Sequence, residues 1–226
     1  MLENARKRIV TPAGIELTLE AEKHVKIMKT DSLLSLGCGT GELESYIAEK
    51  YGNTVIGIDS DRELIRIAKK KVRKNLKFYI GDGENIEYDD KSFDYVYSCG
   101  ALAAFFDKGI VEAYRVLKDR GILIMIEVVF MGSPIPRNVW NTWAHRKIKV
   151  MTGEGLLLEL EKKGFSDIFH KVYYEPEWFK IYYADRGDDP VWAEEKENYL
   201  KFREYIGIGL FIQRKSHVPS ADMYSI

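Results

Sequence analysis

The sequence is poor in cysteine, with only Cys38 and Cys99 among 226 residues. Neither belongs to a CxxC pair or to a cysteine–histidine spacing, so the usual patterns of a structural zinc site are excluded and we expect no bound metal. Both are expected to be small residues in or near the core. Such sparse cysteine fits the reducing cytoplasm, where we expect the protein to be located.

Long apolar runs and an excess of one charge are also missing. The longest apolar stretch, residues 122–130, contains Glu127 and is too short to cross a bilayer, so we expect no stable membrane insertion. The opening MLENARKRIV lacks the apolar centre and cleavage site of a signal peptide. With 34 basic and 35 acidic residues, the chain has no basic excess, and we expect no DNA partner.

What the sequence does contain is a regular alternation of short apolar runs and segments with helical spacing. This pattern is typical of a mostly parallel sheet with helices on both faces, and the length suits one α/β domain spanning residues 1–226. The predicted strands are 32–36, 54–58, 76–80, 93–98, 121–129, 165–174 and 206–214. The predicted helices are 15–29, 41–51, 61–74, 108–117 and 152–163.

Two segments are longer than this alternation needs, residues 131–151 and 175–205. Long insertions on a rigid scaffold commonly recognise substrates, so we expect both to form a substrate cap with helical and aromatic content. Ten aromatic residues lie between Tyr173 and Tyr205, and Trp140 and Trp143 lie in the first insertion. We expect most of these rings to pack the cap and two or three to line a pocket for an apolar, aromatic or cationic small molecule.

A glycine-rich turn, Gly37-Cys38-Gly39-Thr40-Gly41, joins the first predicted strand to the next helix. Such a turn lets a ligand approach the backbone at the carboxyl edge of the sheet. Its GxGxG spacing departs from the dinucleotide pattern GxGxxG, because Glu42 stands at the place of the last glycine. Glu42 and Glu44 would repel a pyrophosphate and suit a ligand with cationic groups, although for these two residues taken alone ordinary stabilisation of the first helical turn is the favoured explanation.

Acidic residues follow the next two strands. Asp59 ends the second strand, 22 residues after Gly37, where a carboxylate can accept hydrogen bonds from ribose hydroxyls. NAD enzymes use the same arrangement, so Asp59 alone does not separate the two cofactors. Asp82 follows the third strand in Gly81-Asp82-Gly83, where its carboxylate could accept the amino group of adenine.

The ordered segments LLSLGCGTG, VIGID, GDGENI and KSFDYVYS resemble the motif set of class I S-adenosylmethionine-dependent methyltransferases over roughly residues 30–130. The resemblance implies a three-layer α/β sandwich with a seven-stranded, mostly parallel sheet, an antiparallel last strand and a cofactor-covering helix within residues 1–30. It also implies S-adenosylmethionine as the cofactor. The implied cofactor-binding residues are Gly37, Cys38, Gly39, Gly41, Asp59, Ser60, Asp82, Gly83 and Ser98.

Within that class, the chain resembles the small-molecule group that includes ubiquinone- and menaquinone-type enzymes. Members often show a pattern like ALHHxxD after the fourth strand, and here residues 101–107 read ALAAFFD. Ala103 and Ala104 replace both histidines, so we do not expect a mechanism that depends on those histidines.

Methyl transfer from a sulfonium is an in-line displacement that positioning alone can accelerate, although a hydroxyl or thiol acceptor also needs a base. The predicted catalytic candidates are Glu127, near the end of the fifth strand, and His145, in the first insertion. His24, His170 and His217 are the remaining histidines that could take this role.

The favoured function is methyl transfer to a small molecule by a monomer or homodimer. The segment SCGA after the fourth strand lacks the [DNS]PP[FYW] pattern of enzymes that methylate amino groups of DNA and protein. Three alternatives stay open: a methyltransferase that acts on protein or RNA, a non-catalytic module that binds S-adenosylmethionine, and a NAD-dependent oxidoreductase, which the GxGxG spacing disfavours.

Overall fold

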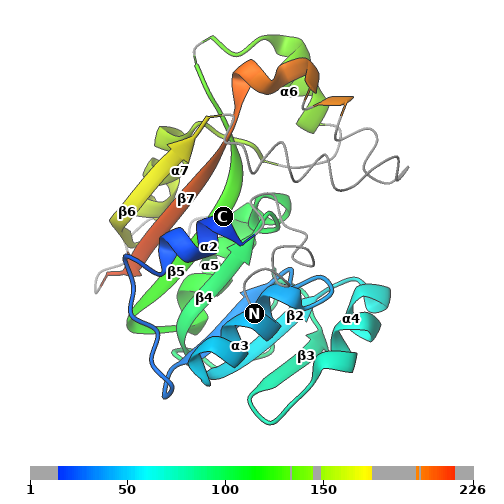
Figure 1. Ribbon diagram of the computed structural model, residues 1–226. Helices are drawn as coiled ribbons and strands as arrows, with labels where there is room; N and C mark the ends of the chain where they lie inside the picture. The colour runs from blue at the N-terminus through cyan, green and yellow to red at the C-terminus, as the bar shows by residue number, and fades with distance from the viewer. Residues whose placement is uncertain (1–14, 133, 145–148, 175–196, 199, 217–226) are drawn as a thin grey trace.

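The computed structural model describes residues 15–132, 134–144, 149–174, 197–198 and 200–216. Within these residues, seven strands form one sheet in the order β3-β2-β1-β4-β5-β7-β6 (Figure 1). The strands are β1 (Ser32–Leu36), β2 (Thr54–Asp59), β3 (Leu76–Ile80), β4 (Phe93–Cys99), β5 (Leu117–Phe130), β6 (Phe165–Tyr173) and β7 (Ile206–Lys215).

The direction of the strands divides the sheet into two parts. β1 pairs in parallel with β2 and β4, β2 with β3, and β4 with β5. β7 lies between β5 and β6 and is antiparallel to both, as predicted for the last strand. Since the chain order reverses between β1 and β4, the carboxyl ends of these two strands border the crevice in which α/β sheets bind ligands.

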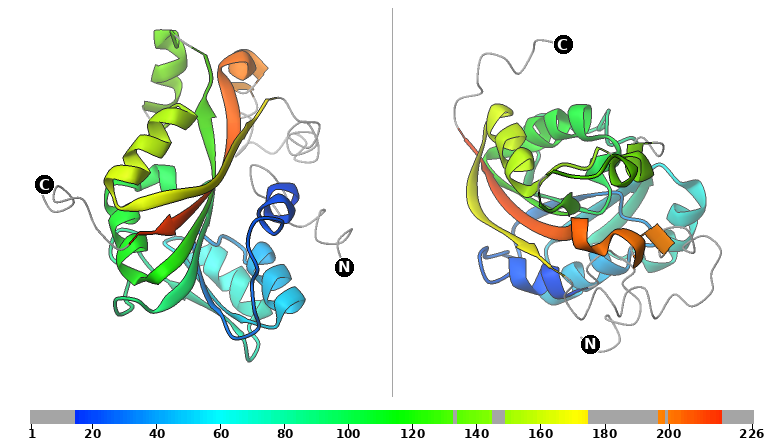
Figure 2. Two further views of the ribbon diagram at one scale, coloured as in Figure 1. Left: turned by 90° about the vertical axis from the view of Figure 1, so that its left-hand side faces the viewer. Right: turned by 90° about the horizontal axis from the view of Figure 1, so that it is seen from above.

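Helices cover both faces of the sheet, and the predicted three-layer arrangement is confirmed (Figure 2). The α-helices of the described residues are α2 (Glu16–Ala21), α3 (Glu42–Tyr51), α4 (Arg62–Ala68), α5 (Phe106–Val116), α6 (Arg137–Ala144) and α7 (Gly153–Lys162). α2, α3 and α4 share one buried cluster with Leu33 and Val55, whereas α5 and α7 share another with Leu34 and Val96. Adjacent residues of a strand thus face opposite layers, as the pleat requires.

Two predicted helices are too long. The helix expected over residues 15–29 ends at Ala21, and Val25 and Ile27 then pack in alternation against the core beside α2. The helix expected over 61–74 ends at Ala68 and continues only as the single 3-10 turn η1 (Lys69–Lys71). In both places tertiary packing of a few apolar side chains decides the conformation, and helical spacing alone could not reveal it.

Described parts of the two predicted insertions meet beyond the carboxyl end of β5. Phe130 pairs with Ile206 at the last position of the β5–β7 ladder, and Val139 of α6 and Phe202 join them in a small separate cluster. The rings of Phe130 and Trp140 pack edge to face at 4.4 Å. Figure 1 shows α6 and the segment before β7 together at the top of the molecule. The role of these segments as a substrate cap stays a prediction.

Several predicted features fall on residues that lie outside the ranges described by the structure. These are residues 1–14 of the N-terminal segment, His145, most of 175–205, and His217. Across the ranges that the structure does describe, no helix is long and apolar enough to cross a membrane.

Candidate functional site

The glycine turn between β1 and α3 is tied to the neighbouring strand β2. The backbone N–H groups of Gly37 and Cys38 donate to the carbonyl oxygen of Ile58 at 2.9 and 3.0 Å. Gly39 has φ of 53°, and a Cβ built there would meet nothing within 4 Å. The turn is therefore held in place from below, while the space above Gly39 is open to a ligand.

Asp59 shapes this turn. Its Oδ2 accepts a hydrogen bond from the N–H of Gly39 at 2.8 Å, and its Oδ1 accepts one from the N–H of Asp61 at 2.9 Å. Each carboxylate oxygen retains a further lone pair, so the predicted contact with ribose hydroxyls is compatible with these bonds. Ser60 lies exposed between the two aspartates.

Asp82 borders a cleft of about 270 Å³ at the carboxyl ends of β2 and β3. The cleft is lined by Ile58, Tyr79, Ile80, Gly81, Asp82, Asn85, Glu87 and Tyr88. One oxygen of Asp82 accepts the N–H of Glu84 at 2.8 Å and fixes the turn. Asp59 and Asp82 thus follow adjacent strands, at the edge where the prediction placed them.

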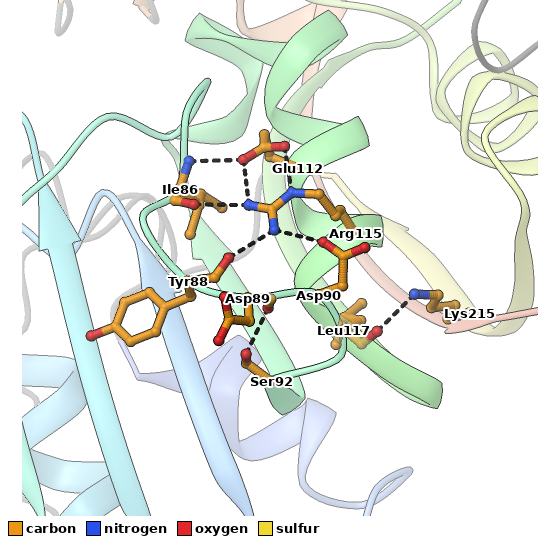
Figure 3. Close-up of polar contacts among 9 residues, drawn as sticks. All are labelled: Ile86, Tyr88, Asp89, Asp90, Ser92, Glu112, Arg115, Leu117 and Lys215. Carbon is orange, nitrogen blue, oxygen red and sulfur yellow. Dashed lines mark hydrogen bonds and ion pairs between the residues drawn. The ribbon is translucent and has the colours of Figure 1, made fainter.

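The far wall of this cleft is held by an ion pair on α5 that sequence reasoning missed (Figure 3). Arg115 donates to the backbone oxygens of Tyr88 at 2.7 Å and Ile86 at 2.8 Å. Glu112 accepts from Arg115 and, at 2.8 Å, from the N–H of Ile86. The hydrogen bonds from Arg115 hold the pKa of Glu112 below its usual range. No local pattern signals this contact, because its partners lie more than twenty residues apart in the chain.

The segment after β4 touches both ligand loops. A Cβ at Gly37 would lie 2.3 Å from the Cβ of Ala101, and a Cβ at Gly83 would lie 2.4 Å from the ring of Phe105. The hydroxyl of Ser98 is fully buried and accepts the N–H of Leu102 at 3.1 Å. Glycine is therefore needed at positions 37 and 83 because this segment packs closely against both turns.

Glu127, a predicted base candidate, anchors the same segment. Its Oε1 accepts the N–H of Leu102 at 2.8 Å, and the N–H groups of Ala101 and Ala103 also bond to the carboxylate. Burial raises the pKa of Glu127 to about 7, and these backbone bonds oppose the rise. The geometry thus favours a positioning role, and proton transfer by Glu127 stays a prediction.

The two described histidines lie away from the glycine turn. His170 pairs with Asp167 at 2.6 Å on β6, the strand at the opposite edge of the sheet from β3. His24 stacks on Phe169, also on β6, with ring centroids 3.6 Å apart. Neither is brought together with Asp59 or Asp82.

The two glutamates at the start of α3 do not act as a pair. Glu42 forms an ion pair with Lys71 at 3.0 Å. Glu44 turns inward, where its Oε1 accepts a hydrogen bond from Ser35 at 2.6 Å. Cys38, nearby, is buried, and burial raises the pKa of its thiol, so it is poorly suited to be a nucleophile. Within the described residues, no group of three metal-binding side chains is found.

Comparison with known proteins agrees with this arrangement. Residues 34–125 match a family model described as a methyltransferase domain. Demethylmenaquinone methyltransferase of Lactobacillus johnsonii is 32% identical over 130 residues, which cover 54% of this chain and 53% of that protein. The chain matches about half the length of the curated relatives first found.

Solved structures extend the similarity over most of the fold. The [4+2]-cyclase SpnF has a TM-score of 0.76 at 24% identity, covering 90% of this chain and 81% of that one. Phosphoethanolamine N-methyltransferase 2 of Haemonchus contortus, in complex with S-adenosylmethionine, has a TM-score of 0.74 at 18% identity, covering 89% and 52%.

The strand order, the glycine turn and the matched domain together define a Rossmann-like methyltransferase fold. Residues 34–125 are similar to a methyltransferase domain, in agreement with the resemblance of the sequence motifs.

Proposed function

We propose that the protein transfers a methyl group from S-adenosylmethionine to a small molecule. The proposal depends on one observation: the open glycine turn, Asp59 and Asp82 lie at the carboxyl ends of adjacent strands, beside a cleft. The similarity to demethylmenaquinone methyltransferase supports a small-molecule acceptor of apolar or aromatic character.

The residues present fit this cofactor. The space above Gly39 admits a ligand against the backbone, Asp59 offers acceptors for a ribose diol, and Asp82 with Gly83 offers polar groups for adenine. We propose that the same cofactor site is also formed by Gly37, Cys38, Gly41, Ser60 and Ser98. The described part of the N-terminal segment, α2, would cover it.

When bound, the sulfonium of S-adenosylmethionine supplies an activated methyl group. The chain's own contribution is to hold and orient the reactants. Asp59 fixes the glycine turn, and Glu127 fixes the segment of Ala101 that packs against it. We assign Glu127 to positioning and keep His145, in the proposed acceptor cap, as the candidate base for a hydroxyl or thiol acceptor.

Calorimetric titration with S-adenosylhomocysteine tests the donor site. We expect Asp59→Ala to weaken binding by about 10- to 100-fold, because charged hydrogen bonds are lost. The matched control is Asp61→Ala, which removes the cap of α4 in the same loop and should leave binding within about 3-fold. Wild-type protein that does not bind S-adenosylhomocysteine would refute the proposal.

A screen of small acceptors with radiolabelled S-adenosylmethionine tests the reaction. Quinols, phenols, amines and thiols form the panel, and transfer to one of them supports the proposal. Binding without transfer to any of them favours a non-catalytic module, and transfer only to protein or RNA favours the other alternative. We further propose a cytoplasmic monomer or homodimer, on the basis of the balanced charge and isolated cysteines.

A further inference from the structure

The carboxyl group of Glu44 is buried and only half satisfied. Its side chain lies in the first turn of α3 and is 2% exposed. Oε1 accepts the hydroxyl of Ser35 at 2.6 Å, whereas Oε2 is buried with no hydrogen-bond partner. Whether the group is ionised or protonated, one hydrogen-bonding position is unmet, and leaving such a group buried costs about 1–3 kcal/mol.

Glu44 lies close to the glycine turn, since its charge adds to the raised pKa of Cys38 in that turn. Ser35, which holds it, comes two residues before Gly37 on β1 and pairs with Gly57 and Tyr97. The hydroxyl of Tyr97 is bonded at 2.6 Å to Thr18 of α2, the helix on the same face of the sheet. The orphaned oxygen is therefore enclosed between β1, β4 and α3, in the layer that α2 covers.

The charges around Glu44 are acidic. Burial raises its pKa to about 7, against the hydrogen bonds from Ser35 and from the backbone of Glu44 itself, and the negative charges of Asp59 and Glu42 add to the rise. A buried carboxylate among other carboxylates is stabilised by a cation or by a charged N–H donor. Ordinary stabilisation of α3 does not require this burial, because a carboxylate at an exposed first turn interacts with the helix dipole equally well.

We propose that Glu44, held by Ser35, is the acceptor for the ammonium group at the amino-acid end of the cofactor. This inference rests on the proposed function and names a residue of the donor site. The unmet oxygen then gains a charged donor, and the turn above it can bind the rest of the ligand. Glu44 would thus distinguish ligands with an amino-acid end from those without one.

The test compares two ligands in calorimetric titrations. S-adenosylhomocysteine carries the amino-acid end, and 5′-methylthioadenosine lacks it. We expect Glu44→Gln to weaken S-adenosylhomocysteine about 10- to 100-fold and to change 5′-methylthioadenosine less than about 2-fold, because a charge-assisted bond is lost. The control is Glu42→Gln, whose carboxylate pairs with Lys71, and it should change either affinity by less than about 3-fold.

Each other outcome has a defined meaning. Equal weakening of both ligands, or no change in either, overturns the inference and leaves Glu44 a structural residue. Should Glu44→Gln fail to fold, Ser35→Ala keeps the carboxyl group but removes its support, and the same preferential loss of S-adenosylhomocysteine is expected. Wild-type protein that binds neither ligand refutes the proposed function itself, a result distinct from selective binding that Glu44 does not control.

Discussion

Glu44 and Glu127 are buried on opposite faces of the same sheet, and burial raises the pKa of each to about 7. They differ in their partners. Glu127 receives backbone N–H groups from the segment after β4, whereas Glu44 receives one hydroxyl and its own backbone N–H and keeps one oxygen without a partner. The comparison thus distinguishes a buried carboxyl group whose hydrogen bonds are made within the protein from one with an oxygen that has no partner. A carboxyl group of the second kind indicates a binding site for a ligand.

The largest expected effect is on stability when the satisfied group is removed. Glu127→Leu should lower the free energy of unfolding by about 3 kcal/mol, because the N–H groups of Ala101 and Ala103 lose their acceptor and that of Leu102 keeps only Ser98. Glu44→Leu should lower it by about 1 kcal/mol or less, since the lost carboxyl was poorly paired. Urea denaturation at pH 7 measures both values, and equal losses would remove the distinction between the two sites.

The pH dependence of stability comes next in size. Both folded-state pKa values lie above the unfolded value of 4.5, so the stabilisation from these groups is complete below about pH 4.5 and is lost as the pH rises through about 7. Each group should account for a fall on the order of 2–3 kcal/mol. Unfolding free energies at pH 5 and 8 should therefore differ less in Glu44→Gln and in Glu127→Gln than in the wild type. An unaltered difference in either variant would show that its carboxyl does not titrate in this range.

The serines beside the two glutamates give a smaller contrast. Ser35→Ala removes the hydroxyl that holds Glu44 and should cost about 1 kcal/mol. Ser98→Ala should cost less, about 0.5 kcal/mol, because the N–H of Leu102 still bonds to Glu127. Thermal and urea denaturation of the two variants, made side by side, measure the difference. A reversed order would mean that Glu127 alone does not satisfy this segment.

The smallest effect is expected for Glu112, a carboxyl group whose pKa is lowered rather than raised in the folded protein. The bond from Arg115 lowers the folded-state pKa of Glu112, so its stabilisation is present above the unfolded value of 4.5 and is lost as the pH falls through the folded value. Glu112→Gln should cost about 0.5–1 kcal/mol at pH 7 and less at pH 3.5. Denaturation at the two pH values checks this, and a larger cost in acid would contradict the assignment.

Sequence patterns predicted the sheet more accurately than its surroundings. The strands 32–36 and 76–80 were predicted with the observed bounds, because short apolar runs next to turn residues leave little choice of boundary. The helix predicted over 15–29 was wrong after Ala21, where Val25 and Ile27 reach the core from a segment without regular secondary structure. Such packing depends on what the rest of the chain places nearby.

The candidate site shows the same division. The glycine turn, Asp59 and Asp82 could be located from sequence, since the turn follows β1, Asp59 ends β2 and Asp82 lies just beyond β3. The support of Tyr88 by Arg115 could not, nor could the choice of Ser35 as the partner of Glu44, because these contacts exist only after distant segments pack together. For Glu127, the sequence indicated the position, and only the structure revealed its backbone partners.

The cluster of Phe130, Val139, Phe202 and Ile206 lies beyond the matched methyltransferase domain, which ends at residue 125 inside β5. It has its own apolar interior, and the β5–β7 ladder joins it to the part of the sheet that carries the glycine turn. None of the residues of this cluster belongs to the glycine turn or to its acidic neighbours, so substitutions there leave those groups in place. Under the proposed function, the acceptor side of the molecule can therefore change while the site for S-adenosylmethionine stays the same.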